Sequence, residues 1–381
     1  MSAPHASGTG AVGIAAATHD GSTVTVEWVD GRTSRFAAIW LLDNRLGSRH
    51  RPEGQRLFDV VELPDDPVIA GVSIEGDGSE LSVGFAHDRS RAEFAATWLR
   101  RYALDPASRA ERRVRHELWD ASLTGRVPTG RFADVSQGGG ALADWLGAVR
   151  DFGVAILTGV PIEPGAVCDV IELFGHVRET NYGRLFDVIA VEDPTNLAYT
   201  GLALGNHTDN PYRDPVPQLQ LLHCLQAAAE GGESVVADGF LAADRLRREH
   251  PDDFALLSGH AVRFRYVEPG AVDLETRAPL IELDLEGEVR AVRYNNRSAA
   301  PLDLAEELVA PHYRATRRFS ELLHDPGAMV GFRLEAGDLF IVDNQRVLHG
   351  RRGFGRGRRH LQGAYSDKDG LLSTLRVLEA R

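Results

Sequence analysis

Apolar and polar positions in the first quarter of the chain alternate in short runs. In residues 23–28, Thr-Val-Thr-Val-Glu-Trp, the period of two is that of a half-buried β-strand. Asp30-Gly31 then gives the turn signal of a hairpin, after which the pattern resumes in residues 33–42. The same pattern returns later in this region, in residues 68–74 and 80–85. We therefore predict a small β-rich domain over residues 21–103, preceded by a flexible, Gly- and Ala-rich N-terminus of residues 1–20.

Residues 104–130 are charged and Arg-rich, and we interpret them as a linker. Beyond them, short strands alternate with a few helices and show no regular strand-helix-strand rhythm. Helices are predicted over residues 142–152, 164–177, 241–248 and 302–323, and strands over 154–157, 185–191, 196–209, 219–225 and 234–238. Residues 131–381 are thus expected to form a mostly β jelly roll with flanking helices and a site between its sheets. We find no internal repeat and no low-complexity tract.

A polar run in residues 205–214 stands just before the predicted strand 219–225. If this run is extended, His207 and Asp209 project from one face and offer an imidazole and a carboxylate to one point. His349, which follows a buried strand at residues 339–344, supplies a third group from far along the chain. Two histidines and one carboxylate with open positions form the facial triad of non-haem Fe(II) oxygenases. The His-x-Asp spacing alone carries little weight, since the chain has 14 histidines.

Arginines return about ten residues after His349, at Arg358 and Arg359. A guanidinium binds a carboxylate through two parallel hydrogen bonds, which is what the far end of a dicarboxylate co-substrate requires. In an acidic chain, an arginine run such as residues 351–359 is as often a solvated loop as an anion site.

The composition narrows the classes of partner. A chain of 381 residues is expected to form two domains. Its net charge of -13 argues against binding nucleic acid or anionic membranes through a basic face, so a small-molecule partner is expected. With only Cys168 and Cys224 there is no disulfide framework and no cysteine-rich zinc motif. We expect a cytoplasmic protein without a signal peptide or a membrane-spanning segment.

Several further motifs occur in one order along nearly the whole chain: Trp-Leu-Arg at 98–100, Leu-Phe-Asp-Val around Phe186, Asn-x-Ala-Tyr at 196–199, Leu-Leu-His-Cys at 221–224, Asp343-Asn344 and Arg-His-Leu-Gln-Gly-Ala-Tyr at 359–365. With them the chain resembles the γ-butyrobetaine dioxygenase branch of the taurine-dioxygenase-like Fe(II)/2-oxoglutarate oxygenases.

The resemblance implies a double-stranded β-helix fold, a homodimer and hydroxylation that consumes O₂ and 2-oxoglutarate and releases succinate and CO₂, with ascorbate as reductant in assays. It makes His207, Asp209 and His349 the iron ligands and Arg359 the partner of the far carboxylate of 2-oxoglutarate. It assigns the same co-substrate further contacts, at Asn196, Leu222 and Ser234. The protein's task in such chemistry is placement of the reacting groups.

The chain departs from this family in its N-terminal domain. The family holds zinc there with three cysteines and a histidine, but Arg45, Gly47 and His50 stand at the cysteine positions. By register from Trp98, Ser90 stands at the histidine position, with His87 nearby. We therefore expect no structural zinc.

The family's aromatic cage for a trimethylammonium group matches four aromatic positions here: Tyr182, Phe186, Tyr199 and Tyr365. Ring faces attract a quaternary cation by roughly 0.5 to 2 kcal/mol each. Any one of these rings taken alone is more often core packing, and it is the four together that favour a cage.

The opposite end of the substrate site is altered. Asn210 replaces the family's tyrosine after the His-x-Asp motif, and Asn295, Asn296 and Arg297 are expected to face the same end. Two amides and a guanidinium suit a strongly anionic head group with three oxygens. The pattern resembles that of 2-(trimethylammonio)ethylphosphonate dioxygenases. For Arg297, a surface ion pair is an equal alternative.

The expected reaction is therefore hydroxylation of 2-(trimethylammonio)ethylphosphonate at the carbon next to phosphorus, with γ-butyrobetaine, which yields carnitine, as the alternative substrate. A taurine-like sulfonate dioxygenase would not need the cage. Two other classes stay open: a zinc-dependent hydrolase and a non-catalytic jelly-roll binding module. Arg359 argues against both, because neither needs an anchor for 2-oxoglutarate.

Overall fold

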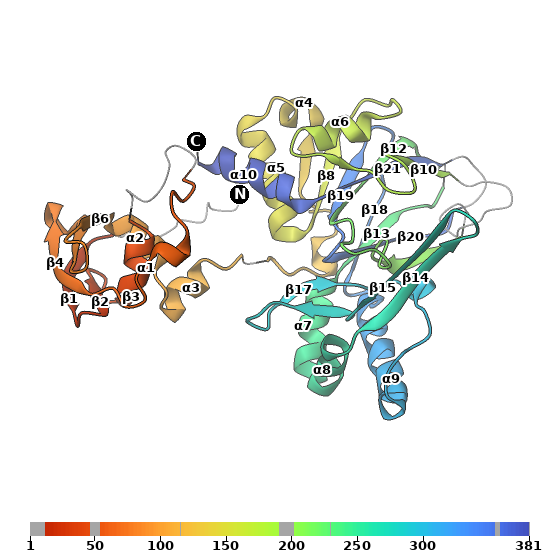
Figure 1. Ribbon diagram of the computed structural model, residues 1–381. Helices are drawn as coiled ribbons and strands as arrows, with labels where there is room; N and C mark the ends of the chain where they lie inside the picture. The colour runs from red at the N-terminus through yellow and green to blue at the C-terminus, as the bar shows by residue number, and fades with distance from the viewer. Residues whose placement is uncertain are drawn as a thin grey trace. The chain divides into compact units, whose positions relative to one another are not determined.

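The structure is a computed structural model that describes residues 12–45, 54–114, 116–189, 202–228, 230–354 and 359–380. The chain divides into two compact units, residues 1–114 and residues 115–381 (Figure 1). No helix in these described ranges is long and apolar enough to cross a membrane.

The first unit contains two three-stranded antiparallel sheets, each followed by a short helix. The first sheet comprises β1 (Ile14–His19), β2 (Thr23–Trp28) and β3 (Thr33–Ala37), followed by α1 (Ala38–Asp43). The second comprises β4 (Ile69–Glu75), β5 (Glu80–Phe85) and β6 (Arg91–Ala95), followed by α2 (Ala96–Tyr102). Two 3₁₀ turns, η2 (Val60–Glu62) and η3 (Gly76–Gly78), and the helix α3 (Pro106–Glu111) complete the elements described in this unit.

These two halves are an internal repeat, which corrects the expectation that the chain has none. Phe-Ala-Ala-Ile-Trp-Leu at residues 36–41 and Phe-Ala-Ala-Thr-Trp-Leu at 94–99 each run from the end of a third strand into a helix. Leu41 and Leu99 are both fully buried in one shared core, and the Trp40 and Trp98 rings lie 5.4 Å apart. The Phe-Ala-Ala-x-Trp-Leu motif, which recurs after 58 residues, is the sequence signal of this repeat.

The limits of this unit differ from those expected. Ile14–His19 pairs with β2, so a strand lies inside the N-terminus that was expected to be flexible. Residues 104–130, which were expected to form a linker, are divided between the two units. The beginning of this range belongs to the first unit, where Ser34 donates a hydrogen bond to Asp105 (Oγ–Oδ2 2.8 Å). Its end belongs to the second unit, where Trp119 is buried and residues 129–131 form a strand.

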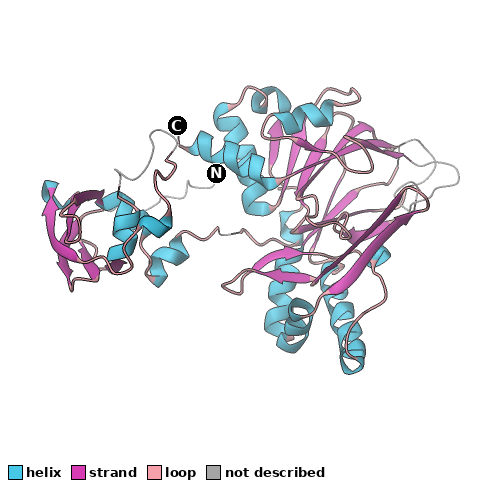
Figure 2. Ribbon diagram, in the orientation of Figure 1, coloured by secondary structure: helices cyan, strands magenta, loops and turns pink. Residues whose placement is uncertain are grey.

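The second unit is built on two main sheets (Figure 2). The seven-stranded sheet has the order β10-β21-β12-β19-β8-β7, with β9 paired to β21. The four-stranded sheet has the order β11-β20-β13-β18. The bounds in the large sheet are β7 (Thr129–Arg131), β8 (Val154–Thr158), β9 (Val177–Arg178), β10 (Phe186–Ile189), β12 (Leu219–Gln226), β19 (Leu339–Asp343) and β21 (His360–Ser366). Those in the small sheet are β11 (Leu204–His207), β13 (Ser234–Asp238), β18 (Met329–Phe332) and β20 (Val347–Arg351). This confirms the prediction of a mostly β jelly roll with flanking helices.

Helices cover the outer faces of this unit. α5 (Gly139–Phe152), α6 (Ala166–Glu172) and α10 (Lys368–Glu379) share a buried apolar cluster with the large sheet, beside the short α4 (Phe132–Val135). A second cluster joins α7 (Gly239–Glu249), α8 (Pro251–Gly259) and α9 (Glu306–Leu323) to the hairpins β14 (Val262–Glu268) with β15 (Val272–Ala278) and β16 (Ile281–Leu283) with β17 (Val289–Val292). Two 3₁₀ turns are η4 (Ala121–Leu123) and η6 (Asn296–Ser298).

Strand β12 shows how the sequence pattern places the site. Leu219 and Leu221 pack in the outer cluster with α5 and α6, whereas Leu222 packs in the cluster that includes Phe340 of β19 and Val236 of β13. Because side chains alternate along a strand, Gln220 and Leu222 share the inner face. The inner face of β12 therefore looks toward the small sheet.

A buried ion pair fixes the turn that leads into β20. Arg346 is fully buried and donates to both carboxylate oxygens of Asp238, at 3.1 and 2.8 Å. Its remaining guanidinium hydrogens reach the carbonyl oxygens of Asp151 (2.7 Å) and Glu117 (2.6 Å). A buried charge is tolerated when its partners are this complete, and these bonds set the register of the strand that carries His349.

Candidate active site

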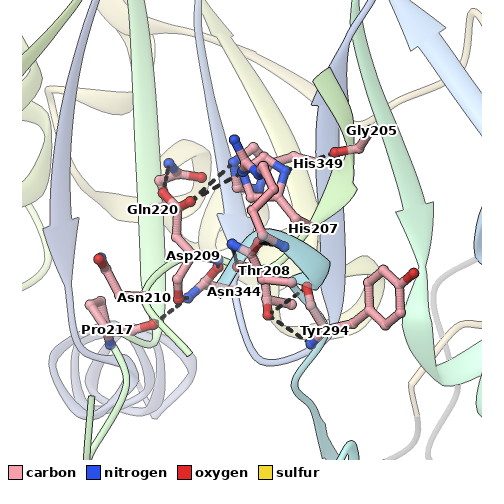
Figure 3. Close-up of polar contacts among 12 residues, drawn as sticks. Gly205, His207, Thr208, Asp209, Asn210, Pro217, Gln220, Tyr294, Asn344 and His349 are labelled. Carbon is pink, nitrogen blue, oxygen red and sulfur yellow. Dashed lines mark hydrogen bonds and ion pairs between the residues drawn. The ribbon is translucent and has the colours of Figure 1, made fainter. Parts of the chain in front are cut away.

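His207, Asp209 and His349 lie together in the second unit (Figure 3). β11 and β20 pair so that His207 stands directly opposite His349, and their ring centroids are 4.5 Å apart. The Oδ1 atom of Asp209 lies 3.3 Å from Nε2 of His207 and 3.8 Å from Nε2 of His349. One ligand atom from each residue thus converges within 4.8 Å of the others, as a mononuclear metal site requires.

Neighbouring groups orient two of these side chains. Nδ1 of His207 lies 2.9 Å from the Gly205 carbonyl oxygen, which selects the tautomer that leaves the Nε2 lone pair free for a metal. The Asp209 amide donates to Asn344 Oδ1 (2.7 Å), and Asn344 Nδ2 donates back to the Asp209 carbonyl (3.0 Å). Gln220 and Tyr365 both donate to Asp209 Oδ2, the hydroxyl at 2.7 Å, so that Oδ1 faces the histidines.

The protonation states suit a metal as well. Burial raises the pKa of Asp209, but its hydrogen bond to His207 and the charge of His349 outweigh that and hold the pKa below its ordinary value. Burial, reinforced by His207, lowers the pKa of His349 to about 3. Near neutral pH the site therefore offers an ionised carboxylate and a neutral imidazole, and nitrogen and carboxylate ligands in this set fit Fe(II).

The expected co-substrate residues Leu222, Ser234 and Arg359 line one cavity together with the three ligands. Arg359 is buried, and burial together with Arg351 lowers the pKa of its guanidinium to about 10, so it is charged at neutral pH. Asn196 lies outside the described residues. A charged arginine in a cavity that holds a metal site is a suitable partner for a carboxylate.

Arg351 is a second arginine of this cavity and was not among the expected residues. It is buried, it donates to the Leu202 carbonyl (2.9 Å), and its guanidinium lies 4.9 Å from the centre of the Phe354 ring. Arg359 lies over the same ring at 6.0 Å. Arg351 follows His349 by two residues on one strand, so the period of two was the signal that could have found it.

Aromatic rings gather near the metal ligands. The Phe186 and Tyr365 rings are 5.1 Å apart, and Tyr182 lies 6.2 Å from Phe186. Tyr199, the fourth expected ring, lies outside the described residues. Two unexpected tyrosines extend the group, because Tyr212 stacks on Tyr266 at 5.0 Å and its hydroxyl lies 2.9 Å from that of Tyr182.

The residues expected at the anionic end separate in the structure. Asn210 is buried with φ of 52°, and its Oδ1 accepts a 2.6 Å bond from Tyr212 while its Nδ2 has no partner in the described ranges. Asn295 is occupied within the fold, donating to the Thr208 carbonyl (3.2 Å) and accepting from the Arg297 amide (3.2 Å). Asn296 lines a different cavity. Burial lowers the pKa of Arg297, and the Asp209 carboxylate opposes that shift, so the two groups interact electrostatically.

The comparisons with known proteins agree with this geometry. Residues 119–365 match the model of the family described as taurine catabolism dioxygenase TauD, TfdA family. A γ-butyrobetaine dioxygenase from Pseudomonas sp. (strain AK-1) is 39% identical, covering 96% of each chain. A trimethyllysine dioxygenase from Meyerozyma guilliermondii is 29% identical over 96% of each chain. The crystal structure of the PvcB protein from Pseudomonas aeruginosa is 25% identical, with a TM-score of 0.45, covering 58% of this chain and 79% of that one.

When bound, the family's resident metal would supply the oxidising chemistry, and His207, Asp209 and His349 are the residues that would hold it. The family match covers more than half of the chain, and the jelly roll contains the converging His207, Asp209 and His349. This chain belongs to the TauD/TfdA family and is an Fe(II)- and 2-oxoglutarate-dependent dioxygenase.

Proposed function

We propose that this dioxygenase hydroxylates a small trimethylammonium zwitterion, with γ-butyrobetaine as the first candidate and carnitine as its product. The observation that carries the proposal is the group of rings beside the metal ligands, in which Tyr182, Phe186 and Tyr365 lie within 6.2 Å of a neighbouring ring centroid. A quaternary cation is weakly hydrated and cannot donate hydrogen bonds, so ring faces are its natural partners. The Pseudomonas relative is named for γ-butyrobetaine, and this supports that substrate over the phosphonate expected from the sequence.

In this proposal, different residues of the chain bind the cation and the co-substrate. Phe186 and Tyr182 present ring faces to the cation, and Tyr365 adds a third ring while its hydroxyl fixes Asp209. Arg359 binds the far carboxylate of 2-oxoglutarate, with Leu222 and Ser234 as walls of the same cavity. Holding the cation and the co-substrate in these two places would determine which substrate carbon lies nearest the metal site.

A second candidate is 2-(trimethylammonio)ethylphosphonate, favoured by Asn210 and Arg297. The Nδ2 group of Asn210 is a buried donor without a partner in the described part of the chain, and it directly follows the metal ligand Asp209. A buried unpaired donor costs about 1 to 3 kcal/mol, which a ligand oxygen would relieve. With the Arg297 charge nearby, this end can take a dianion as well as a carboxylate.

The experiment is succinate formation from 2-oxoglutarate with Fe(II) and ascorbate, measured over matched carboxylate, phosphonate and sulfonate forms of the trimethylammonium compound. We expect kcat/KM to be highest for γ-butyrobetaine. A higher value for the phosphonate would establish the second candidate. Faster turnover of compounds that lack the trimethylammonium group would contradict both.

Two sets of variants test the ends of the pocket separately. Phe186→Ala should lower kcat/KM for γ-butyrobetaine about tenfold and that for 4-aminobutyrate far less, because only the quaternary cation depends on ring faces. Tyr365→Ala is a poorer test, since it also removes a hydrogen bond from Asp209.

Asn210→Tyr and Arg297→Ala should each shift the phosphonate-to-carboxylate ratio of kcat/KM toward the carboxylate. An unchanged ratio in both variants would show that these residues do not bind the anion.

A further inference from the structure

Tyr212 joins two parts of the catalytic unit that are separate in the sequence. It stands three residues after the metal ligand Asp209 and is 6% exposed. Its hydroxyl lies 2.9 Å from that of Tyr182, and it donates a 2.6 Å hydrogen bond to Oδ1 of Asn210. A phenol has a single proton, and Tyr212 gives its proton to Asn210, so Tyr182 is the donor in the bond between the two hydroxyls.

The segment that carries Tyr212 is held firmly in the fold. Arg293 is 8% exposed and donates to the carbonyl oxygens of Pro211 (2.9 Å) and Arg213 (3.2 Å), the two residues that flank Tyr212. The same guanidinium donates to Glu282 at 3.0 Å. These charge-assisted bonds fix the backbone on both sides of Tyr212.

The Tyr212 ring is oriented as well. Tyr266 of β14 stacks on it, with the ring centroids 5.0 Å apart and the planes 21° from parallel. Since backbone, ring and hydroxyl of Tyr212 all have partners, its hydroxyl is a fixed point relative to the nearby metal ligand Asp209.

Tyr182 belongs to a different segment, a tight turn between β9 and β10. Thr180 and Gly183 exchange backbone hydrogen bonds of 3.1 and 2.9 Å, and the Tyr182 amide donates to the Thr180 hydroxyl at 3.1 Å. The half-buried Tyr182 ring lies 6.2 Å from that of Phe186, which lines the cavity with the metal ligands. The turn fixes its own backbone, and the bond to Tyr212 fixes the Tyr182 ring relative to the metal site.

We propose that Tyr212 is a positioning residue for substrate choice: by holding the Tyr182 ring it sets the distance between the substrate's cation and the metal site, and thereby the chain length that is hydroxylated. The inference rests on the proposed function, in which Tyr182 presents its ring to a trimethylammonium group. With the cation held at one end, each added methylene changes which carbon lies nearest the metal site. A displacement of about 1 Å can lower a rate roughly a hundredfold, so the position of one ring can discriminate between chain lengths.

The first experiment compares γ-butyrobetaine with 5-(trimethylammonio)pentanoate, which is one methylene longer, in wild type and in Tyr212→Phe. This variant keeps the ring that stacks on Tyr266 and removes only the hydroxyl. We expect the ratio of kcat/KM for the shorter over the longer compound to fall about threefold or more, while the KM for 2-oxoglutarate stays within about twofold of its wild-type value. An unchanged ratio, including an equal loss for both compounds, would overturn the proposal.

Tyr294→Phe is the matched control. Tyr294 is also buried, at 7% exposed, and its hydroxyl donates to Ser320 (2.7 Å) instead of to a residue of the cation site. Its ratio should equal that of wild type. A fall as large as that in Tyr212→Phe would show that the loss of any buried hydroxyl relaxes the selectivity, which contradicts a specific role for Tyr212.

The second experiment measures binding without turnover. γ-Butyrobetaine is titrated calorimetrically under argon into enzyme loaded with Fe(II) and 2-oxoglutarate. Tyr182→Phe and Tyr212→Phe should each weaken binding about fivefold, and the double variant should be no weaker than either, because both changes break the same hydrogen bond. Effects that multiply to about 25-fold would show that the two hydroxyls act independently, which overturns the proposal.

Failure of the proposed function gives a different result. Wild-type enzyme that neither binds nor turns over any trimethylammonium compound would refute the proposed function, and the role of Tyr212 with it. Normal binding and turnover by wild type, together with an unchanged Tyr212→Phe variant, would refute the role of Tyr212 alone.

Discussion

Arg45 donates a hydrogen bond from Nη1 to the hydroxyl of Ser90, at 3.1 Å. The same nitrogen lies 3.1 Å from the carboxylate of Asp88. The family resemblance places a zinc-binding cysteine at Arg45 and the zinc-binding histidine at Ser90. Where relatives join these two positions through a metal, this chain joins them through a guanidinium, so the link is kept and the thiolate chemistry is lost.

Purified protein is accordingly expected to contain no stoichiometric zinc, because the described ranges hold a single group of residues suited to a metal, His207, Asp209 and His349. Elemental analysis after removal of iron measures the zinc content. Gly47 and His50 lie outside the described residues, so one tightly held zinc would show that His50 or His87 completes a site.

Removing any iron ligand should abolish turnover without unfolding the protein. His207→Ala, Asp209→Ala and His349→Ala each delete a group that points at the shared site rather than a piece of the apolar core. Succinate formation should fall at least a hundredfold, while the melting temperature of the iron-free protein changes by only a few degrees. His360→Ala, a histidine of β21 that pairs with Asp187 at the surface, is the control and should retain activity. Near-normal turnover in any of the three would refute the metal assignment.

The co-substrate anchor is tested by three arginine variants. Arg359→Met should raise the KM for 2-oxoglutarate more than tenfold, since the paired hydrogen bonds to its far carboxylate are lost. Arg352→Met, at an exposed position between the two buried arginines, should have little effect. A larger effect from Arg351→Met would move the anchor to that residue. Arg358, which lies outside the described residues, is the remaining rival, and its methionine variant completes the series.

The stability of the protein should depend on pH through His223. This side chain is 0% exposed, neither ring nitrogen has a partner in the described ranges, and burial lowers its pKa from 6.5 to about 4. Between those values the unfolded chain binds a proton that the folded chain does not, so stability falls as the pH is lowered. The loss from pH 7 to pH 5 should be roughly 2 kcal/mol.

Urea unfolding of the iron-free protein at the two pH values measures this loss. His223→Leu should lessen the pH dependence by roughly this amount, and His19→Leu, at an exposed position, should not change it. An equal pH dependence in wild type and His223→Leu would show that His223 is not the group responsible.

Much of the site was predictable because it rests on local geometry. His207 and Asp209 are two residues apart, and a strand puts such residues on one face whatever the rest of the chain does. The strand before His349 is an uninterrupted apolar run, which identified it as buried. Family motifs then supplied Arg359, Leu222 and Ser234, which the structure places in the same cavity as the metal ligands.

What the sequence left open concerned residues whose neighbours are distant in the chain. Nothing local shows that Asn295 is bound to Thr208, 87 residues away, or that Tyr212 stacks on Tyr266 of a separate hairpin. Whether a polar side chain faces a substrate or is occupied by the fold depends on which partners the packed sheets bring to it. The sequence by itself determined which groups the chain can offer to a metal and its co-substrate. Only the tertiary structure decided which of the remaining polar and aromatic side chains are free to contact a ligand, because non-local packing determines which of them already have partners in the fold.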